Sequence, residues 1–454
     1  MSLSEVLYRR YTTSARDQCT DLDEAILLLR KALTLLPPAL QLRLGGLMNL
    51  TRVLCDRFHH SICSYDHSVE MVFLDEAISL LDEILAQLPV THPRQPSVLD
   101  LQSCTLKELY KHSRQLPNLD NSISLQRDNL LLTPPMHPDR PINLCSLGHA
   151  LYDRFLHSGQ SKDLKEAIEV TQESLWALTE MDPDVCNVAQ HLGRLFHSRY
   201  LLTQTRKDLD DVMEAFRVAV GCESAVVSQR FIAAQQWAKY ADASDHVSAI
   251  DAYVEAIGLM PRLAYGLDLQ SRQSVLTPNT DGLARNAAAC AIRTGRLDMA
   301  VELLEEGRAV FWSQVLQLRT PLSELMLKAP EIGQKLNDIS NALARGSLRD
   351  VFKNIPNTSN VALEEQEGSR LRHLNEQWQA GLKEVRKIDG FETFLLLKHL
   401  ETLQLAAANG PVVILNASER DCAALVLKSA EADVLHVPLP KFSPFHASPP
   451  HYGR

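Results

Sequence analysis

Between residues 22 and 261, apolar and polar positions follow one pattern that returns at a fixed distance. The segment Leu-Asp-Glu-Ala-Ile of residues 22–26 recurs with few changes at residues 74–78, 119–123, 164–168 and 209–213. Its small residue falls on Ala77, Ser122, Ala167 and Val212, which are 45 residues apart. A fixed period of this length predicts stacked two-helix units rather than one globular core.

The first helix of each unit, helix A, is predicted from a second set of periodic residues. Tyr110, Phe155 and Tyr200 each lie twelve residues before the small residue of their unit, and an apolar residue lies four positions before each aromatic. Gly148 and Gly193 lie seven residues before the aromatics of their units. Spacings of three, four and seven place these side chains on one helical face.

The second helix, helix B, is predicted to begin at the Leu-Asp-Glu-Ala-Ile segment. Asp21 and Glu24, like Asp163 and Glu166, have the spacing of a capping box. A proline follows the small residue by twelve positions at Pro37, Pro89, Pro134 and Pro261. Because proline has no backbone N–H to donate, each of these is predicted to end its helix.

These helix pairs resemble the tetratricopeptide repeat (TPR). Ala25 and Ala32 match the small positions of its helix B, and Leu147-Gly148 and Leu192-Gly193 match its helix A. The usual repeat has about 34 residues, so the 45-residue period implies a helix A that is longer by nearly two turns and includes His157 and Ser158. HEAT-type pairs of about 40–47 residues fit the length but do not predict this residue pattern.

The expected fold class is all-α, with a superhelical TPR-like solenoid of helix pairs over residues 1–310. A helical connector is expected over 311–408, with a linker near 345–360 and helices near 331–344, 363–387 and 391–408. Residues 410–416, 421–427 and 434–439 then show the composition of short strands and form a β-containing fragment over 409–442. Residues 443–454 lack periodicity and are predicted to be a disordered tail.

The last third of the chain resembles the segment that joins TPR arrays to CHAT domains, which are caspase-like domains of many large fungal proteins. The resemblance rests on residues 306–314, 318–322, 378–394, 410–416 and 436–440. It implies that 409–442 are the first strands of an incomplete CHAT-like α/β domain. An active CHAT domain is a cysteine protease whose His–Cys dyad lies farther downstream, so no catalytic residue is carried over and the chain is expected not to be an enzyme. Since Leu7, Arg10 and Tyr11 fit helix A positions inside a repeat, both ends are expected to be truncated.

Composition narrows the function classes further. The 454 residues carry a formal net charge of −10, whereas a dedicated nucleic-acid binder would present a basic face. The sequence has no signal-peptide core and no run of about 18 apolar residues, so a soluble cytoplasmic protein is expected. The nine cysteines are scattered without the clustered spacing of a metal site, and no cofactor is expected.

Arg57, Arg154 and Arg199 precede the helix A aromatics and are the candidate partner-binding residues, because basic residues bind a carboxylate in some TPR peptide clamps. The alternative interpretation is structural, with each arginine paired to Asp56, Asp153 or an acid of the next repeat. Histidines also recur near helix A ends, at His59, His60, His157, His191 and His197. Repetition of the unit and the helix dipole explain them more simply than a metal site does.

One pair of residues in the predicted strands could in principle act as nucleophile and base. Cys422 lies on the second strand and His436 on the third. A chance pair within the sheet is the favoured interpretation.

Three functional hypotheses follow. The favoured one is a non-enzymatic scaffold that binds a protein or peptide partner on the solenoid surface. The alternative is the regulatory or substrate-recognition arm of a CHAT-type caspase-like cysteine protease whose catalytic part is missing from this chain. The third is a structural remnant whose incomplete sheet exposes unpaired strand edges.

Overall fold

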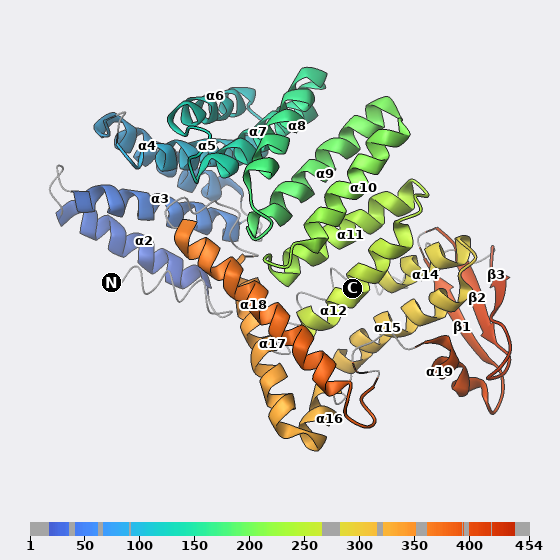
Figure 1. The fold of residues 1–454 in the computed structure, drawn as a ribbon. Coiled ribbons are helices and arrows are strands. Elements are labelled where there is room, and N and C mark those ends of the chain that lie inside the picture. The colour runs from blue at the N-terminus through green and yellow to red at the C-terminus, as the bar shows by residue number, and fades with distance from the viewer. Residues whose placement is uncertain are drawn as a thin grey trace, which may run out of the picture. The chain divides into compact units, whose positions relative to one another are not determined.

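The computed structural model describes residues 18–35, 41–61, 67–89, 92–265, 282–315, 321–350, 361–392, 394, 399–418 and 420–440. The chain forms two compact units, Met1–Val212 with Leu348–Gly368 and Met213–Ser347 with Ser369–Arg454. It is mostly helical, with consecutive helices paired as in TPR-like repeats and one small sheet (Figure 1). The predicted fold class is confirmed. The positions Leu7, Arg10 and Tyr11 and the predicted tail at 443–454 lie outside the described residues.

The first unit is built from helix A–helix B pairs. Helix α2 is a helix B, the pairs α3–α4, α5–α6 and α7–α8 follow it, and α9 leads into α10, which ends in the second unit. The bounds are α2 Gln18–Leu35, α3 Gln41–Ser61, α4 His67–Gln87, α5 Gln95–Ser113, α6 Leu116–Leu132, α7 Arg140–Ser158, α8 Ser161–Ala177, α9 Asp184–Thr203 and α10 Arg206–Gly221. The long helix A of the sequence prediction is confirmed in α7, which ends at Ser158.

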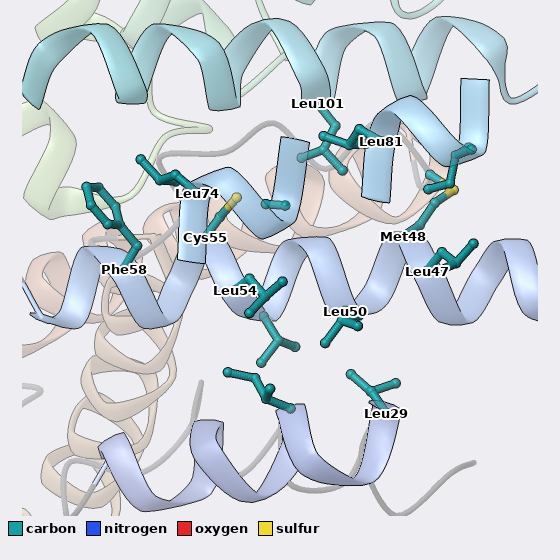
Figure 2. Close-up of a cluster of buried hydrophobic side chains, with 14 of the residues drawn as sticks. Leu29, Leu47, Met48, Leu50, Leu54, Cys55, Phe58, Leu74, Leu81 and Leu101 are labelled. Carbon is teal, nitrogen blue, oxygen red and sulfur yellow. The ribbon is translucent and has the colours of Figure 1, made fainter. Parts of the chain in front are cut away.

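The periodic small residues mark the centres of the helix contacts. Ala25, Ala77, Ser122, Ala167 and Val212 are all fully buried. Figure 2 shows why α3 is apolar on more than one side: Leu50 and Leu54 point toward Leu29 of α2, while Cys55 lies on the side of α4 and Leu74. A helix placed between two others must bury both flanks, and the hydrophobic stripe widens accordingly.

Three successive A helices end in the same way. The residue after each helix is left-handed, with φ of 55° at Arg114, 70° at Gly159 and 54° at Gln204. Its N–H donates to the carbonyl of the periodic aromatic, Tyr110, Phe155 or Tyr200. This single bond is the αL form of a helix C-terminus. The repeat therefore preserves the geometry of the turn even where the residue is not glycine.

The second unit continues with two ordinary helix pairs and with a helical connector whose residues 348–368 belong to the first unit. The pairs are α11–α12 and α14–α15, with bounds α11 Val227–Ala243, α12 Ala249–Tyr265, α14 Leu283–Arg293 and α15 Leu297–Val315. The connector helices are α16 Pro321–Lys328, α17 Pro330–Asp350 and α18 Val361–Val385. Leu325 and Leu336 pack with Trp378 and Leu382 in one core cluster. Trp378 is almost fully buried in this cluster.

The predicted strands form an antiparallel sheet in the order β1-β2-β3, with β1 Val412–Ala417, β2 Cys422–Leu427 and β3 Leu435–Pro438. Leu425 and Leu427 belong to a core cluster with Ala288 and Leu304 of the last helix pair. The Asn416 side-chain amide donates to the Arg285 carbonyl at 2.9 Å. The inner face of the sheet therefore packs on α14 and α15.

Three boundaries differ from the sequence prediction. Helix α12 runs past Pro261 to Tyr265, because its packing on α11, α14 and α15 outweighs one missing backbone donor. Helix α17 continues to Asp350, into the segment predicted as a linker, and residues 351–360 lie outside the described chain. Of the helix predicted over 391–408, the described residues show only α19 (Leu400–Gln404) and a 3₁₀ turn at Leu405–Ala407.

A local turn explains why the helix predicted over 391–408 is shorter in the structure. Gly390 adopts φ 84° after α18, and the N–H groups of Phe391 and Phe394 donate to carbonyls three residues before them. Phe394 is thereby buried in the Trp378 cluster. The apolar residues Phe391 and Phe394, which favoured a helix in the sequence prediction, thus lie in a turn.

None of the described helices combines the length and apolar character that crossing a bilayer requires.

The contact between α7 and α8 yields a stability prediction. A methyl group at Gly148 would overlap the Thr171 hydroxyl and come within 3.4 Å of the Ala167 carbonyl. We expect Gly148→Ala to lower the free energy of unfolding by about 1–3 kcal/mol because the core is overpacked. Urea denaturation followed by circular dichroism measures this loss.

Two further variants test the stated cause. Thr171→Ala removes the overlapped hydroxyl, so the double variant should regain part of the loss and give a coupling energy of about 1 kcal/mol. Gly221→Ala in α10 is the matched control, because no atom lies within 4 Å of its added methyl. Equal losses from Gly148→Ala and Gly221→Ala would contradict this account.

Candidate functional site: the helix A face of the first unit

In the first unit, successive A helices approach one another more closely than successive B helices do. Helix α5 contacts α7, and α7 contacts α9. Rings meet across these helices, in the pairs Phe58–His112, Tyr110–His157 and His149–His191. The B helices are instead bridged by long side chains, in the pairs Arg30–Glu76 and Arg127–Glu166. Closer spacing on one side curves a stack of helix pairs toward that side, so the A helices line its inner face.

Polar groups gather on this inner face, which we call the helix A face: Asp100 and Lys107 of α5, His149 and Asp153 of α7, and His191 and Arg194 of α9. Spacings of three, four or seven residues keep the members from each helix on one side of it. Asp100 and His191 are almost fully buried, and the other four are partly exposed. The face is therefore polar but recessed.

Burial changes the acid–base behaviour of the two carboxyl groups. It raises the pKa of Asp100, against a hydrogen bond of 2.7 Å from the Gln126 amide. It also raises the pKa of Asp153, where the charges of Lys107 and Lys111 oppose the rise. Each acid thus has a nearby donor or cation that stabilises its ionised form.

The two histidines form a stacked pair between α7 and α9. Their ring centroids are 3.5 Å apart with an interplanar angle of 26°. Burial, followed by the charges of Arg194 and Lys107, lowers the pKa of His191 to about 3. Burial and then the neighbouring His191 hold the pKa of His149 well below its usual range. Both rings are neutral at pH 7, and Tyr152 packs edge-on against His191 while Arg194 lies over the Tyr152 ring.

The three arginines predicted as partner-binding residues all have carboxylate partners. Arg57 pairs with Asp23 at 2.7 Å, and Arg154 pairs with Asp120 at 3.0 Å and Asp163 at 2.8 Å. Arg199 contacts Asp208 and Asp211, each at 2.7 Å. The pairing acids lie on helix B of the preceding or the same unit, whereas the structural alternative named Asp56, Asp153 or an acid of the next repeat.

Among the members of the helix A face, sequence reasoning named only His191, as a recurring histidine, and Asp153, as a candidate ion-pair partner of an arginine. The others were missed because they do not recur at the 45-residue period. The sequence did contain a weaker signal. Asp100 and Lys107 are seven residues apart, and His149 and Asp153 are four apart, so each pair lies on one side of its helix, outside the apolar pattern.

The recurring histidines serve as packing partners in the described helices. His112 lies edge-on to Phe58 with centroids 4.8 Å apart, and His157 Nδ1 lies 3.1 Å from the Tyr110 hydroxyl. The side chains of His59 and His60 lie outside the described residues. Over the part of the chain that the structure describes, no group of three or more His, Cys, Asp or Glu side chains is placed to hold a metal ion.

The sheet keeps Cys422 and His436 apart. His436 is the cross-strand partner of Leu425 and therefore shares the inner face with it. Cys422 lies three residues before Leu425 on β2, and since side chains alternate along a strand, it faces the other side. These two residues do not form a nucleophile–base pair.

No protein-family model matches the chain, and no curated protein matches it. Among solved structures, the chain is similar to a crystal structure of a putative kinesin light chain from Podospora anserina, described as having nearly identical TPR-like repeats. The two are 16% identical, the match covers 47% of this chain and 92% of that one, and the TM-score is 0.34.

The arginine pairs predict unequal effects on stability. Asp163 is only 4% exposed, so Arg154→Met leaves a buried carboxylate without its cation and should lower the unfolding free energy by about 2 kcal/mol. Asp23 is 54% exposed, and Arg57→Met should cost less than about 1 kcal/mol. Urea denaturation of both variants checks the order, and a larger loss in Arg57→Met would contradict it.

The histidine pair predicts a pH dependence. Its folded pKa values lie below the unfolded value of about 6.5, so protonation favours the unfolded chain and stability falls as pH drops below that value. Between pH 6.5 and 5, His191→Gln should lose about 1.5 kcal/mol less unfolding free energy than the native chain. Urea denaturation at the two pH values measures the difference, and parallel losses in both proteins would show that His191 is not the titrating group.

Proposed function

We propose that this protein is a non-enzymatic interaction scaffold, and that the helix A face of its first unit binds an extended segment of a protein partner. The observation that supports this proposal is that half-buried charged side chains from three successive helices line this face. Repeat arrays bind partners along such extended inner surfaces. With a net charge of −10, the chain favours a protein partner over nucleic acid.

The charges on the face suggest what the segment offers. Lys107 and Arg194 provide cations on the two outer helices of the set, and the His149 ring, stacked on the buried His191, provides a neutral, flat surface between them. An extended peptide would place carbonyl or carboxylate oxygens toward the cations and an apolar side chain toward the rings.

Arg57, Arg154 and Arg199 support this face indirectly in the proposal. Their ion pairs hold helix A against helix B and so fix the spacing of the units. Direct contact of these arginines with a partner stays a prediction, and the binding assay below can include Arg154→Met.

The test begins with selection of peptides on the full chain from a displayed random library, followed by affinity measurement with labelled peptides. Lys107→Gln and Arg194→Gln should each weaken binding about tenfold, which corresponds to about 1.4 kcal/mol. Lys165→Gln is the matched control, because Lys165 lies on helix B with a side chain that is 79% exposed. Equal affinities for all three variants, or loss only in Lys165→Gln, would overturn the proposal.

A second proposal is that the chain is the recognition arm of a CHAT-type cysteine protease. The observation that favours it is the outer face of the sheet, on which Val413, Leu415, Leu435 and Val437 are exposed. In α/β domains, helices cover such an apolar face. In this proposal the chain alone cleaves no peptide. Hydrolysis of fluorogenic peptides by the purified chain, lost in Cys422→Ala, would refute the non-enzymatic assignment.

A further inference from the structure

The second unit contains a cavity of about 710 Å³. It is lined by residues of the α10 end, α11, α12 and α18. Trp237 and Trp378 line it, and both side chains are at least 95% buried, so they form fixed apolar walls. The Trp237 indole N–H donates to the Ser248 hydroxyl at 3.0 Å and is not available to a ligand. A volume of this size accommodates a small molecule or a few peptide residues.

Arg230 gives the cavity an unused hydrogen-bond donor. Its side chain is only 7% exposed, and its Nε donates to the Val220 carbonyl at 2.8 Å. Its Nη1 is buried and has no hydrogen-bond partner among the residues that the structure describes. A buried guanidinium N–H without an acceptor is unfavourable, and an anionic oxygen is the acceptor that a guanidinium binds best. The geometry therefore calls for an acceptor from outside the chain.

Gly258 keeps the cavity open. It lies in the middle of α12, where glycine weakens a helix relative to alanine. Within the described part of the chain, no heavy atom outside the local helix backbone lies within 4 Å of the position that a Cβ would take, so no packing neighbour requires a glycine there. Because Gly258 lines the cavity, the missing side chain leaves space for an occupant.

Acidic side chains limit what that occupant can be. Glu223, Asp251 and Glu255 also line the cavity and are exposed, and Arg217 and Arg386 line it as well. With Arg230 the lining carries three acidic and three basic groups, so it offers no net positive charge to a phosphate-rich ligand. The fitting ligand carries one carboxylate and an apolar group beside it.

We propose that this cavity binds a carboxylate attached to an apolar group, with the carboxylate on Arg230 and the apolar group between Trp237 and Trp378. The shared chemistry has two sources, the C-terminal residue of a peptide and a free small carboxylic acid. The site is independent of the helix A face, since all of its residues belong to the second unit.

The experiment titrates the full chain with N-acetyl-phenylalanine and with acetyl-Ala-Ala-Phe, each as the free acid and as the amide. Calorimetry and tryptophan fluorescence report binding. We expect at least one acid to bind and its amide to bind at least about tenfold more weakly. Tighter binding of the tripeptide acid assigns a peptide C-terminus, and equal or tighter binding of N-acetyl-phenylalanine assigns a free acid.

Variants separate the site from general effects on folding. Gly258→Leu should abolish binding by filling the cavity without lowering the melting temperature, whereas the smaller Gly258→Ala should leave binding within about threefold. Arg230→Lys keeps the charge, loses the planar fork and should weaken binding about tenfold. Failure of both acids to bind at roughly 10 mM, equal binding of acid and amide, or native affinity in Gly258→Leu would each overturn the proposal.

Discussion

The close approach of helix A to helix B at their small residues is the constraint on which the rest of the first unit depends. Gly148 has no side chain where α7 meets Thr171 and Ala167 of α8, and the small residues of helices α2, α4, α6, α8 and α10 are buried completely. Two helices this close exclude water along their length, and the pair then presents a flat apolar flank to the next pair. Because each pair can bury that flank only on a neighbour, stacking follows, and an inner face lined by A helices follows from stacking.

The longer helix A changes the contacts between neighbouring helix pairs. Its additional turns carry His112 and His157, which meet Phe58 and Tyr110 of the preceding A helix. These aromatic contacts draw the A helices together, while ion pairs between long side chains span the B helices. Aromatic contacts thus join the A helices, and ion pairs join the B helices. The helix A face lies on the side where the helices are closer together, and it is therefore recessed.

Periodic features of the fold could be predicted from the sequence, and features without a period could not. Ala25, Ala77 and Ala167 repeat because each solves the same packing problem, so their burial could be inferred before any coordinates existed. The role of Pro261 was predicted wrongly because packing between α12 and its neighbours decides where that helix ends. The stacked histidines and the buried Arg230 Nη1 do not recur with the repeat, and their environment comes from residues far away in the chain. No local pattern records such an environment.

The three-stranded sheet has a consequence for the end of the second unit. A stack of helix pairs has an apolar flank at its end, and an uncovered flank invites a second molecule to continue the stack. Here β2 covers Ala288 and Leu304, and β1 is fastened to α14 by the bond from Asn416 to the Arg285 carbonyl. Strands cannot continue the ridges and grooves of a helix pair. The sheet therefore covers the flank of the α14–α15 pair on which a further helix pair would stack.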